Sequence, residues 1–191
     1  MHFILASQSP RRQQLLQLLQ VPFDVRPADI DEAMDPALPP QQEVARVSLC
    51  KAKATPCSPG DVVIAADTIV VLDGAVLGKP ADRAEAMAML HALSGREHLV
   101  MTGLTVLRDG RAITHTEITG VHFRPLTEAE IFRYVETGEP MDKAGAYGIQ
   151  GLAAPFVEGI RGDYYNVMGL PVCRLYKMLQ DLAPEYMEES Q

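Results

Sequence analysis

One carboxylate interrupts an apolar stretch of the sequence in which a buried strand is expected. Asp67 stands in the middle of the run VIAADTIVV, whose β-branched residues predict a strand covered on both faces. An unpartnered carboxylate is costly there, so something must compensate its charge. A metal ion or a water molecule to be activated fits this need. A strand end at which the aspartate accepts backbone hydrogen bonds fits it equally well.

Two adjacent arginines raise a related question near the N-terminus. Arg11 and Arg12 follow ASQSP, in which Ser9 is placed to cap a helix and Pro10 to begin it. A helix N-terminus carries partial positive charge, so two cations there make sense when an anion joins them. One interpretation is a phosphate bound by the hydroxyls of Ser7 and Ser9 and by a guanidinium group. The other sends both arginines outward to surface carboxylates.

Three lysines and one glutamine are further candidates for ligand binding. Lys51 and Lys53 lie on a predicted helix and Lys79 follows a predicted hairpin, yet each taken alone is expected to be a solvated surface lysine. The segment DKAGAYGIQG contains three glycines, which favour tight turns. Such turns leave the amide of Gln150 able to donate and accept hydrogen bonds, as reading a nucleobase edge requires.

An acidic loop bears on the question of a metal site. ADIDEAMDP places Asp29, Asp31 and Glu32 together, which supplies the oxygen ligands that Mg²⁺ prefers but is also typical of a solvated loop. The five histidines show no metal-ligand spacing, so we expect structural roles for them. The three cysteines are scattered without a CxxC pair, which indicates reduced thiols rather than a disulfide framework or a zinc site.

The charge and hydropathy of the chain limit its partners. A formal net charge of -8 over 191 residues argues against binding to a nucleic acid polymer or an anionic membrane. No apolar run approaches the roughly 20 residues that span a bilayer, and the N-terminus lacks the features of a signal peptide. We therefore expect a cytoplasmic protein whose anionic ligands are held by local cations.

The elements that must position these residues alternate between strands and helices. Asp-Gly pairs at 73–74 and 109–110 predict two hairpins, and Thr127 with Glu130 forms a capping-box pattern. Strands are expected over 2–7, 61–80, 99–107 and 112–123, a short extended segment over 21–27, and helices over 10–19, 41–54, 81–95, 127–138 and 170–182. Hairpins within this alternation favour a mixed-sheet α/β protein over a purely parallel doubly wound one.

Several of these stretches, in this order, resemble the Maf family of nucleoside triphosphate pyrophosphatases. They are ASQSPRR, DIDE, CKAKA, AADTIVVLDG with LGKP, MTG, DKAGAYGIQG and GDYYNVMGLP, and the resemblance runs from about Ile4 to about Leu179. It implies one domain over residues 1–191, with an elongated mixed sheet flanked by helices and a nucleotide cleft between two lobes, as in ITPase-like proteins. It also implies hydrolysis of a nucleoside triphosphate between the α and β phosphates.

The resemblance assigns roles to individual residues. Asp67 matches the catalytic carboxylate that accepts a proton, and with Glu32 it would bind a divalent cation, Mg²⁺ or Mn²⁺. The positions that match phosphate-binding residues are Ser7, Ser9, Arg12, Lys51 and Lys79. The specificity positions are Arg11, Thr68 and Gln150, and the forms ADT and YGIQG resemble the branch that acts on dTTP and UTP.

Other functions stay open at this point. The chain can be a nucleotide-binding regulator of cell division without catalysis, although the presence of Asp67, Glu32, Lys51 and Lys79 together favours an enzyme. It can also be an enzyme of the same family that acts on modified pyrimidine nucleotides, in nucleotide-pool cleaning, or on another base such as that of 7-methyl-GTP. Relatives in the family often form homodimers, so a homodimer is expected.

Overall fold

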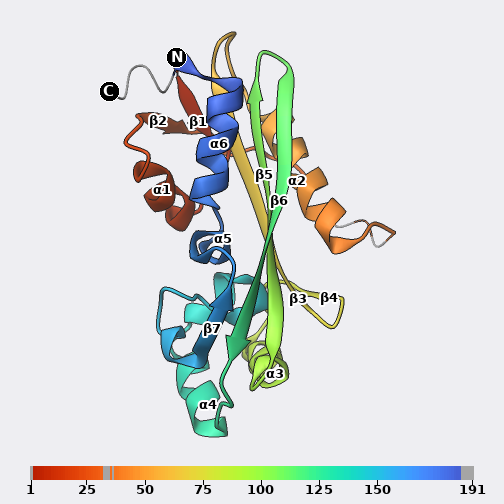
Figure 1. The fold of residues 1–191 in the computed structure, drawn as a ribbon. Coiled ribbons are helices and arrows are strands. Elements are labelled where there is room, and N and C mark those ends of the chain that lie inside the picture. The colour runs from red at the N-terminus through yellow and green to blue at the C-terminus, as the bar shows by residue number, and fades with distance from the viewer. Residues whose placement is uncertain (1, 32–34, 36, 186–191) are drawn as a thin grey trace. The chain divides into compact units, whose positions relative to one another are not determined.

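The computed structural model describes residues 2–31, 35 and 37–185, and its central feature is a mixed seven-stranded sheet (Figure 1). The strand order is β2-β1-β3-β5-β6-β7, with β4 paired to β3. The strands are β1 (Phe3–Leu5), β2 (Phe23–Val25), β3 (Val62–Leu72), β4 (Ala75–Leu77), β5 (Glu97–Arg108), β6 (Arg111–Phe123) and β7 (Val157–Arg161). Strand β1 is parallel to β2 and β3, whereas β4 and β7 pair antiparallel, so the prediction of a mixed sheet is confirmed.

Helices flank this sheet, as the sequence predicts for an α/β protein. The α-helices are α1 (Pro10–Gln17), α2 (Pro40–Ala54), α3 (Arg83–Leu93), α4 (Glu128–Glu136), α5 (Tyr164–Met168) and α6 (Val172–Leu182). Three 3₁₀ helices are η1 (Glu139–Asp142), η2 (Ala144–Ala146) and η3 (Ala154–Phe156). Among the described residues, no helix is both long and apolar enough to cross a membrane.

Internal packing divides the chain into two compact units. The first comprises Met1–Asp67, Thr102–Glu117 and Gly169–Gln191, and the second comprises Thr68–Met101 and Ile118–Met168. Each unit buries its own set of apolar side chains.

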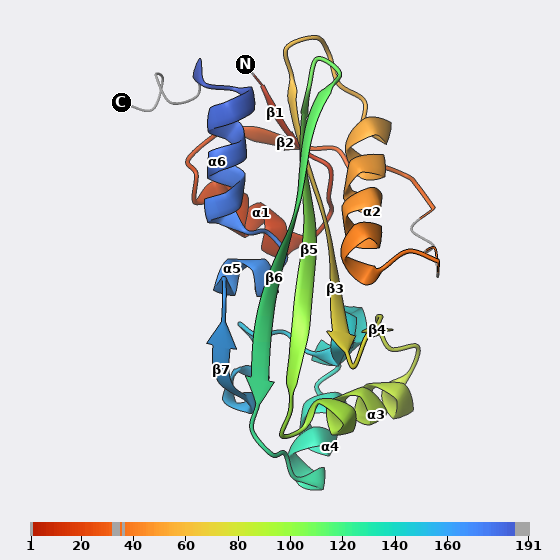
Figure 2. The ribbon, with the colours of Figure 1, turned by 45° about the vertical axis from the view of Figure 1, so that its right-hand side comes forward.

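In the first unit, α2 lies on one side of the strands while α1 and α6 lie on the other (Figure 2). The buried residues Ile4, Val63 and Ala65 pack with Ala52 of α2. Helix α2 also approaches β5 closely, because a Cβ atom at Gly103 would overlap the carbonyl group of Val44 and lie 2.8 Å from the backbone nitrogen of Ala45. This close approach holds α2, and therefore the side chains on its inner face, tightly against the sheet.

In the second unit, α3 and α4 contribute to a core that includes a group of aromatic rings. Phe123 packs edge-to-face against Tyr147 and Phe156, and Tyr134 of α4 packs against Phe156 with ring centroids 5.2 Å apart. The buried imidazole of His98 joins this group and shares a 2.8 Å hydrogen bond with the hydroxyl of Tyr147. Edge-to-face packing of this kind fixes ring orientations as well as burying apolar area.

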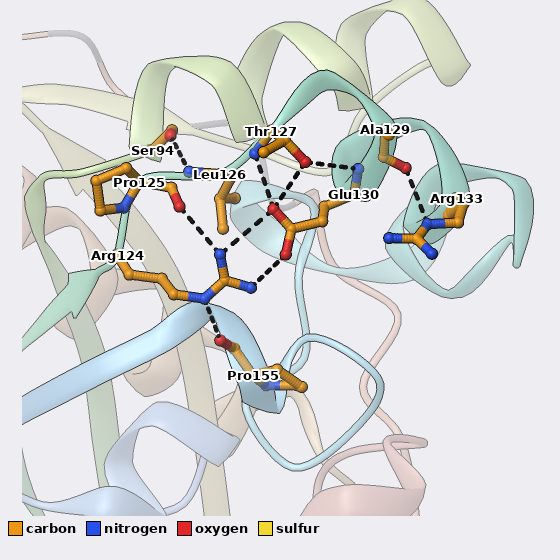
Figure 3. Close-up of polar contacts among 9 residues, drawn as sticks. All are labelled: Ser94, Arg124, Pro125, Leu126, Thr127, Ala129, Glu130, Arg133 and Pro155. Atoms are coloured by element: carbon orange, nitrogen blue, oxygen red, sulfur yellow. Dashed lines mark hydrogen bonds and ion pairs between the residues drawn. The ribbon is translucent and has the colours of Figure 1, made fainter.

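A dense set of polar contacts fixes the start of α4 (Figure 3). The carboxylate of Glu130 accepts hydrogen bonds from the guanidinium of Arg124 at 2.6 Å and from the backbone and hydroxyl of Thr127 at 2.9 and 2.8 Å. Leu126 N donates to the hydroxyl of Ser94 at 2.7 Å. The Arg124 guanidinium, followed by the Thr127 bonds, lowers the pKa of Glu130 to about 2. The predicted capping box is therefore confirmed.

The predicted turns are also present. Asp73 and Gly74 have φ angles of 51° and 82°, and Asp109 and Gly110 have 48° and 78°. Positive φ at both central residues is the mark of the hairpin turn for which Asp-Gly is favoured. The prediction for the first strand is too long, because β1 ends at Leu5 rather than near Ser7.

Candidate active site

The parallel strands of the first unit bring three chain segments to one edge of the sheet. Ala6 N donates to the carbonyl of Ile64 at 2.8 Å, and Arg26 N donates to the carbonyl of Leu5 at 3.0 Å. The segment with Ser7 therefore leaves β1 on the side where β2 gives way to the acidic loop and where β3 continues toward Asp67. In α/β sheets, ligands bind outside the carboxyl ends of parallel strands.

The segment after β1 forms a compact hydroxyl and guanidinium cluster. The hydroxyl of Ser7, which is 8% exposed, accepts hydrogen bonds from Ser9 N and from Arg12 Nη1, both at 3.2 Å. Ser9 caps α1 as predicted, and its hydroxyl accepts a long hydrogen bond of 3.5 Å from Arg12 N. Arg12 Nε donates to the carbonyl of Gly169 at 2.8 Å. The guanidinium of Arg12 therefore joins the segment after β1 to the segment before α6.

Lys51 and Asp67 form an ion pair between α2 and β3. Lys51 Nζ lies 2.8 Å from Asp67 Oδ1, and the side chains are only 8% and 18% exposed. The expectation that Lys51 alone would be a solvated surface lysine is wrong, because α2 turns it toward the sheet, whereas Lys53 is exposed. Asp67 lies within β3 rather than at its end, so the strand-end interpretation of this residue is also wrong.

The remaining predicted residues of the site lie in different surroundings. Arg11 on α1 is half-buried in the first unit. In the second unit, Thr68 is half-buried, while Lys79 and Gln150 are exposed. Glu32, predicted as a metal ligand, lies outside the residues that the structure describes.

Among the described residues of the site, Asp67 supplies one carboxylate that could bind a divalent cation. Among residues 2–31, 35 and 37–185 there is no group of three or more histidine, cysteine and acidic side chains close enough to hold a metal ion. The carboxylate of Asp67 is partly exposed, and carboxylate oxygens are what Mg²⁺ and Mn²⁺ prefer. A cation at this position would need Glu32 or the ligand's own oxygens to complete its coordination.

The chain matches a known protein family over nearly its whole length. Residues 2–182 match the family of the Maf-like protein. The chain belongs to this family. This Maf-like protein is 55% identical over 177 residues to the dTTP/UTP pyrophosphatase of Symbiobacterium thermophilum, covering 92% of this chain and 91% of the relative. It is 50% identical over 187 residues to the dTTP/UTP pyrophosphatase of Chlorobaculum parvum, covering 95% and 94%.

One solved structure supports the fold of the Maf-like protein. The HAM1 protein from Coxiella burnetii superposes with a TM-score of 0.53, covering 95% of this chain and 99% of the other. The two sequences are 15% identical, so this similarity concerns the fold alone. The expectation of an ITPase-like mixed sheet flanked by helices is confirmed.

The Maf-like protein also has a buried glutamate on α2 that the sequence patterns did not indicate. Glu43 of α2 is 0% exposed, and its carboxylate accepts hydrogen bonds from Arg46 Nε at 2.8 Å and from Asp35 N at 2.9 Å. The Arg46 guanidinium lowers the pKa of Glu43. Glu43 and Arg46 are three residues apart on a helix, next to the apolar Val44 and Val47, and this pattern could have indicated an ion pair that covers a carboxylate.

Proposed function

We propose that this Maf-like protein is a nucleoside triphosphate pyrophosphatase that hydrolyses dTTP and UTP to the monophosphate and pyrophosphate. Relatives that are 50–55% identical over nearly the whole chain carry the name dTTP/UTP pyrophosphatase, which supports this activity. The observation that carries the proposal is the Lys51–Asp67 ion pair beside the carboxyl ends of parallel strands. Location in the cytoplasm and assembly as a homodimer stay predictions.

Asp67 is the proposed catalytic base. Water attacks the α phosphorus, the bond from this phosphorus to the oxygen bridging to the β phosphorus breaks, and the oxygen leaves with pyrophosphate. The carboxylate of Asp67 orients the water and takes its proton. Lys51, 2.8 Å away, compensates the charge of the carboxylate and holds it in one place.

The phosphate-binding groups are proposed from the cluster after β1 and from two lysines. Ser7, Ser9 and Arg12 present hydroxyl and guanidinium donors beside the N-terminus of α1, a position that favours anions. Lys51 and Lys79 add charge that would stabilise pyrophosphate as it leaves.

A divalent cation is proposed as cofactor, with Glu32 and Asp67 as its protein ligands. When bound, Mg²⁺ or Mn²⁺ would act as a Lewis acid that withdraws negative charge from the phosphate oxygens. The carboxylates of this pair provide the hard oxygen ligands that such a cation prefers.

Base selection is assigned to Arg11, Thr68 and Gln150. The amide of Gln150 can donate to O4 of thymine or uracil and accept from N3–H, whereas cytosine presents the reverse pattern. Gln150 is exposed, so its amide is accessible to a nucleotide.

Pyrophosphate release tests the proposal directly. The substrates are dTTP, UTP, CTP, dATP, GTP and 7-methyl-GTP with Mg²⁺ or Mn²⁺, and the variants are Asp67→Asn and, as a matched control, the exposed Asp181→Asn. We expect release from dTTP and UTP, a loss of about 100-fold or more in kcat for Asp67→Asn with nucleotide binding retained, and wild-type rates for the control. Binding without hydrolysis across the panel would instead indicate a regulator, and preferred hydrolysis of 7-methyl-GTP would indicate another branch of the family.

A further inference from the structure

The predicted base-reading residue lies in a tight turn of the second unit. Gly151 N donates to the carbonyl of Gly148 at 3.0 Å, which closes a four-residue turn with Ile149 and Gln150 at its centre. Ile149 is buried, while Gln150 is exposed. The side chain of Ile149 therefore packs into the second unit, while Gln150 is accessible to a ligand.

A chain of hydrogen bonds clamps the backbone on both sides of Gln150. Gly148 N donates to the hydroxyl of Tyr134 at 3.3 Å, and this hydroxyl donates to Glu139 Oε1 at 3.0 Å. Leu152 N donates to the same carboxylate, 3.1 Å from each oxygen. Through Tyr134, one carboxylate thus ties together the residues two positions before and two positions after Gln150.

Two glycines of the turn lie close to the side chains of Glu139 and Lys143. A Cβ atom at Gly151 would overlap the carboxylate of Glu139, and a Cβ atom at Gly148 would lie 2.8 Å from Cε of Lys143. Lys143 Nζ in turn donates to the carbonyl of Glu139 at 2.6 Å and to Asp142 at 2.6 Å. The side chains of Glu139 and Lys143 therefore pack directly against the backbone of the turn.

The clamp is built on a rigid support. Tyr134 is buried on α4, where it packs against Phe156, and Gly138, with a φ of 76°, ends the helix immediately before Glu139. Burial, together with the nearby negative charge of Glu139, raises the pKa of Tyr134. The phenol therefore keeps its proton at neutral pH and can donate it in the hydrogen bond to Glu139.

We propose that Glu139 is a positioning residue for base selection, whose carboxylate fixes the turn that presents the Gln150 amide to a pyrimidine base. This inference rests on the proposed function, because it presumes that Gln150 reads the base. A hydrogen-bonding group selects between similar ligands only when it is held in position, since an amide carried on a mobile turn can shift to satisfy the wrong partner as well. Removing the clamp would therefore relax selectivity more than it slows catalysis.

The test compares kcat and KM for UTP and CTP in clamp variants and in a control. Glu139→Ala removes both acceptor oxygens, Glu139→Gln retains one oxygen for Leu152 N, and Tyr134→Phe removes only the relay hydroxyl. The control is Glu130→Gln, which weakens the cap of α4 without touching the turn. We expect the ratio of kcat/KM for UTP over CTP to fall about tenfold in Glu139→Ala, mainly through a higher KM for UTP. In Glu139→Gln we expect this ratio to fall less than in Glu139→Ala. In Glu130→Gln we expect the ratio to be that of the wild type, although the thermal stability is lower.

The outcomes separate this inference from the proposed function. A wild-type enzyme that hydrolyses CTP as well as UTP would overturn the role of Gln150, and with it the premise. A wild-type preference for UTP that persists in Tyr134→Phe and in a folded Glu139→Ala would overturn the role of Glu139 alone. Should Glu139→Ala fail to fold, Tyr134→Phe and Glu139→Gln decide the matter, because each keeps most of the packing around the turn.

Discussion

Lys51 Nζ and Asp67 Oδ1 lie 2.8 Å apart in surroundings that leave both side chains largely buried. Helix α2 delivers the ammonium group from its last turn, where the negative end of the helix dipole favours a cation. Strand β3 delivers the carboxylate from the middle of an apolar run. The charge that made Asp67 anomalous in the sequence is therefore compensated by a residue on a neighbouring helix.

Removing this ammonium group is expected to affect stability and catalysis together. In Lys51→Met the aliphatic stem stays, but the carboxylate of Asp67 loses its partner, which should lower the free energy of unfolding by about 2 to 3 kcal/mol. We expect kcat/KM for UTP to fall by about 100-fold or more. Urea unfolding and pyrophosphate release measure the two effects.

The matched control for this change is Lys53→Met. Lys53 lies two residues further along α2 and is exposed, so its loss should leave both stability and turnover near those of the wild type. Equal effects of the two substitutions would contradict a specific role for the buried pair.

A backbone contact in the first unit gives a prediction about stability. Gly103→Ala places a Cβ atom against the carbonyl of Val44 on α2, so that either the helix or the strand must move. We expect a loss of about 3 kcal/mol or more in the free energy of unfolding, measured by urea denaturation. Gly159→Ala is the control, because nothing lies within 4 Å of a Cβ atom at that position. A loss as large in the control would refute the steric explanation.

The buried imidazole of His98 predicts a pH dependence of stability. Burial lowers its pKa from 6.5 to about 4, so the folded chain holds it neutral where the unfolded chain binds a proton. Stability from this residue is complete above pH 6.5 and is lost as the pH falls toward 4, by at most about 3 kcal/mol. Unfolding by urea at pH 7, 6 and 5 should show this slope in the wild type.

Two variants assign the slope to its source. His98→Gln should flatten the decrease in stability between pH 6.5 and 4, whereas replacement of the half-exposed His115 by Gln should leave it in place. An identical pH dependence in the wild type and in His98→Gln would exclude this histidine as the cause.

Local signals in the sequence predict much of the fold. The Asp-Gly pairs at 73–74 and 109–110 and the capping box of Thr127 and Glu130 act over a few residues, and each is present in the structure. Strand β7 and helix α5 are missed because no buried apolar residue marks them: four of the five residues of β7 are exposed, and the buried residue of α5 is the polar Asn166.

The candidate site is harder to predict because its contacts join distant elements. Lys51 and Asp67 were separate candidates in the sequence, and only the packing of α2 on the sheet brings them into contact. Lys51 follows Val44 and Val47 at helical spacing and shares their face of α2, but a lysine on such a face can also extend its ammonium group to water. The clamp on the 148–151 turn likewise depends on Tyr134 and Glu139, whose side chains carry no motif of their own.

The turn that carries Gln150 has a consequence for how substrate range can change. Its shape is held by backbone groups of Gly148 and Leu152 and by the side chain of Glu139, while Gln150 is exposed. A single substitution at position 150 would therefore replace the proposed recognition group without remodelling the turn beneath it. In such an arrangement, single substitutions at this position would change the preferred base while the free energy of unfolding stays nearly constant.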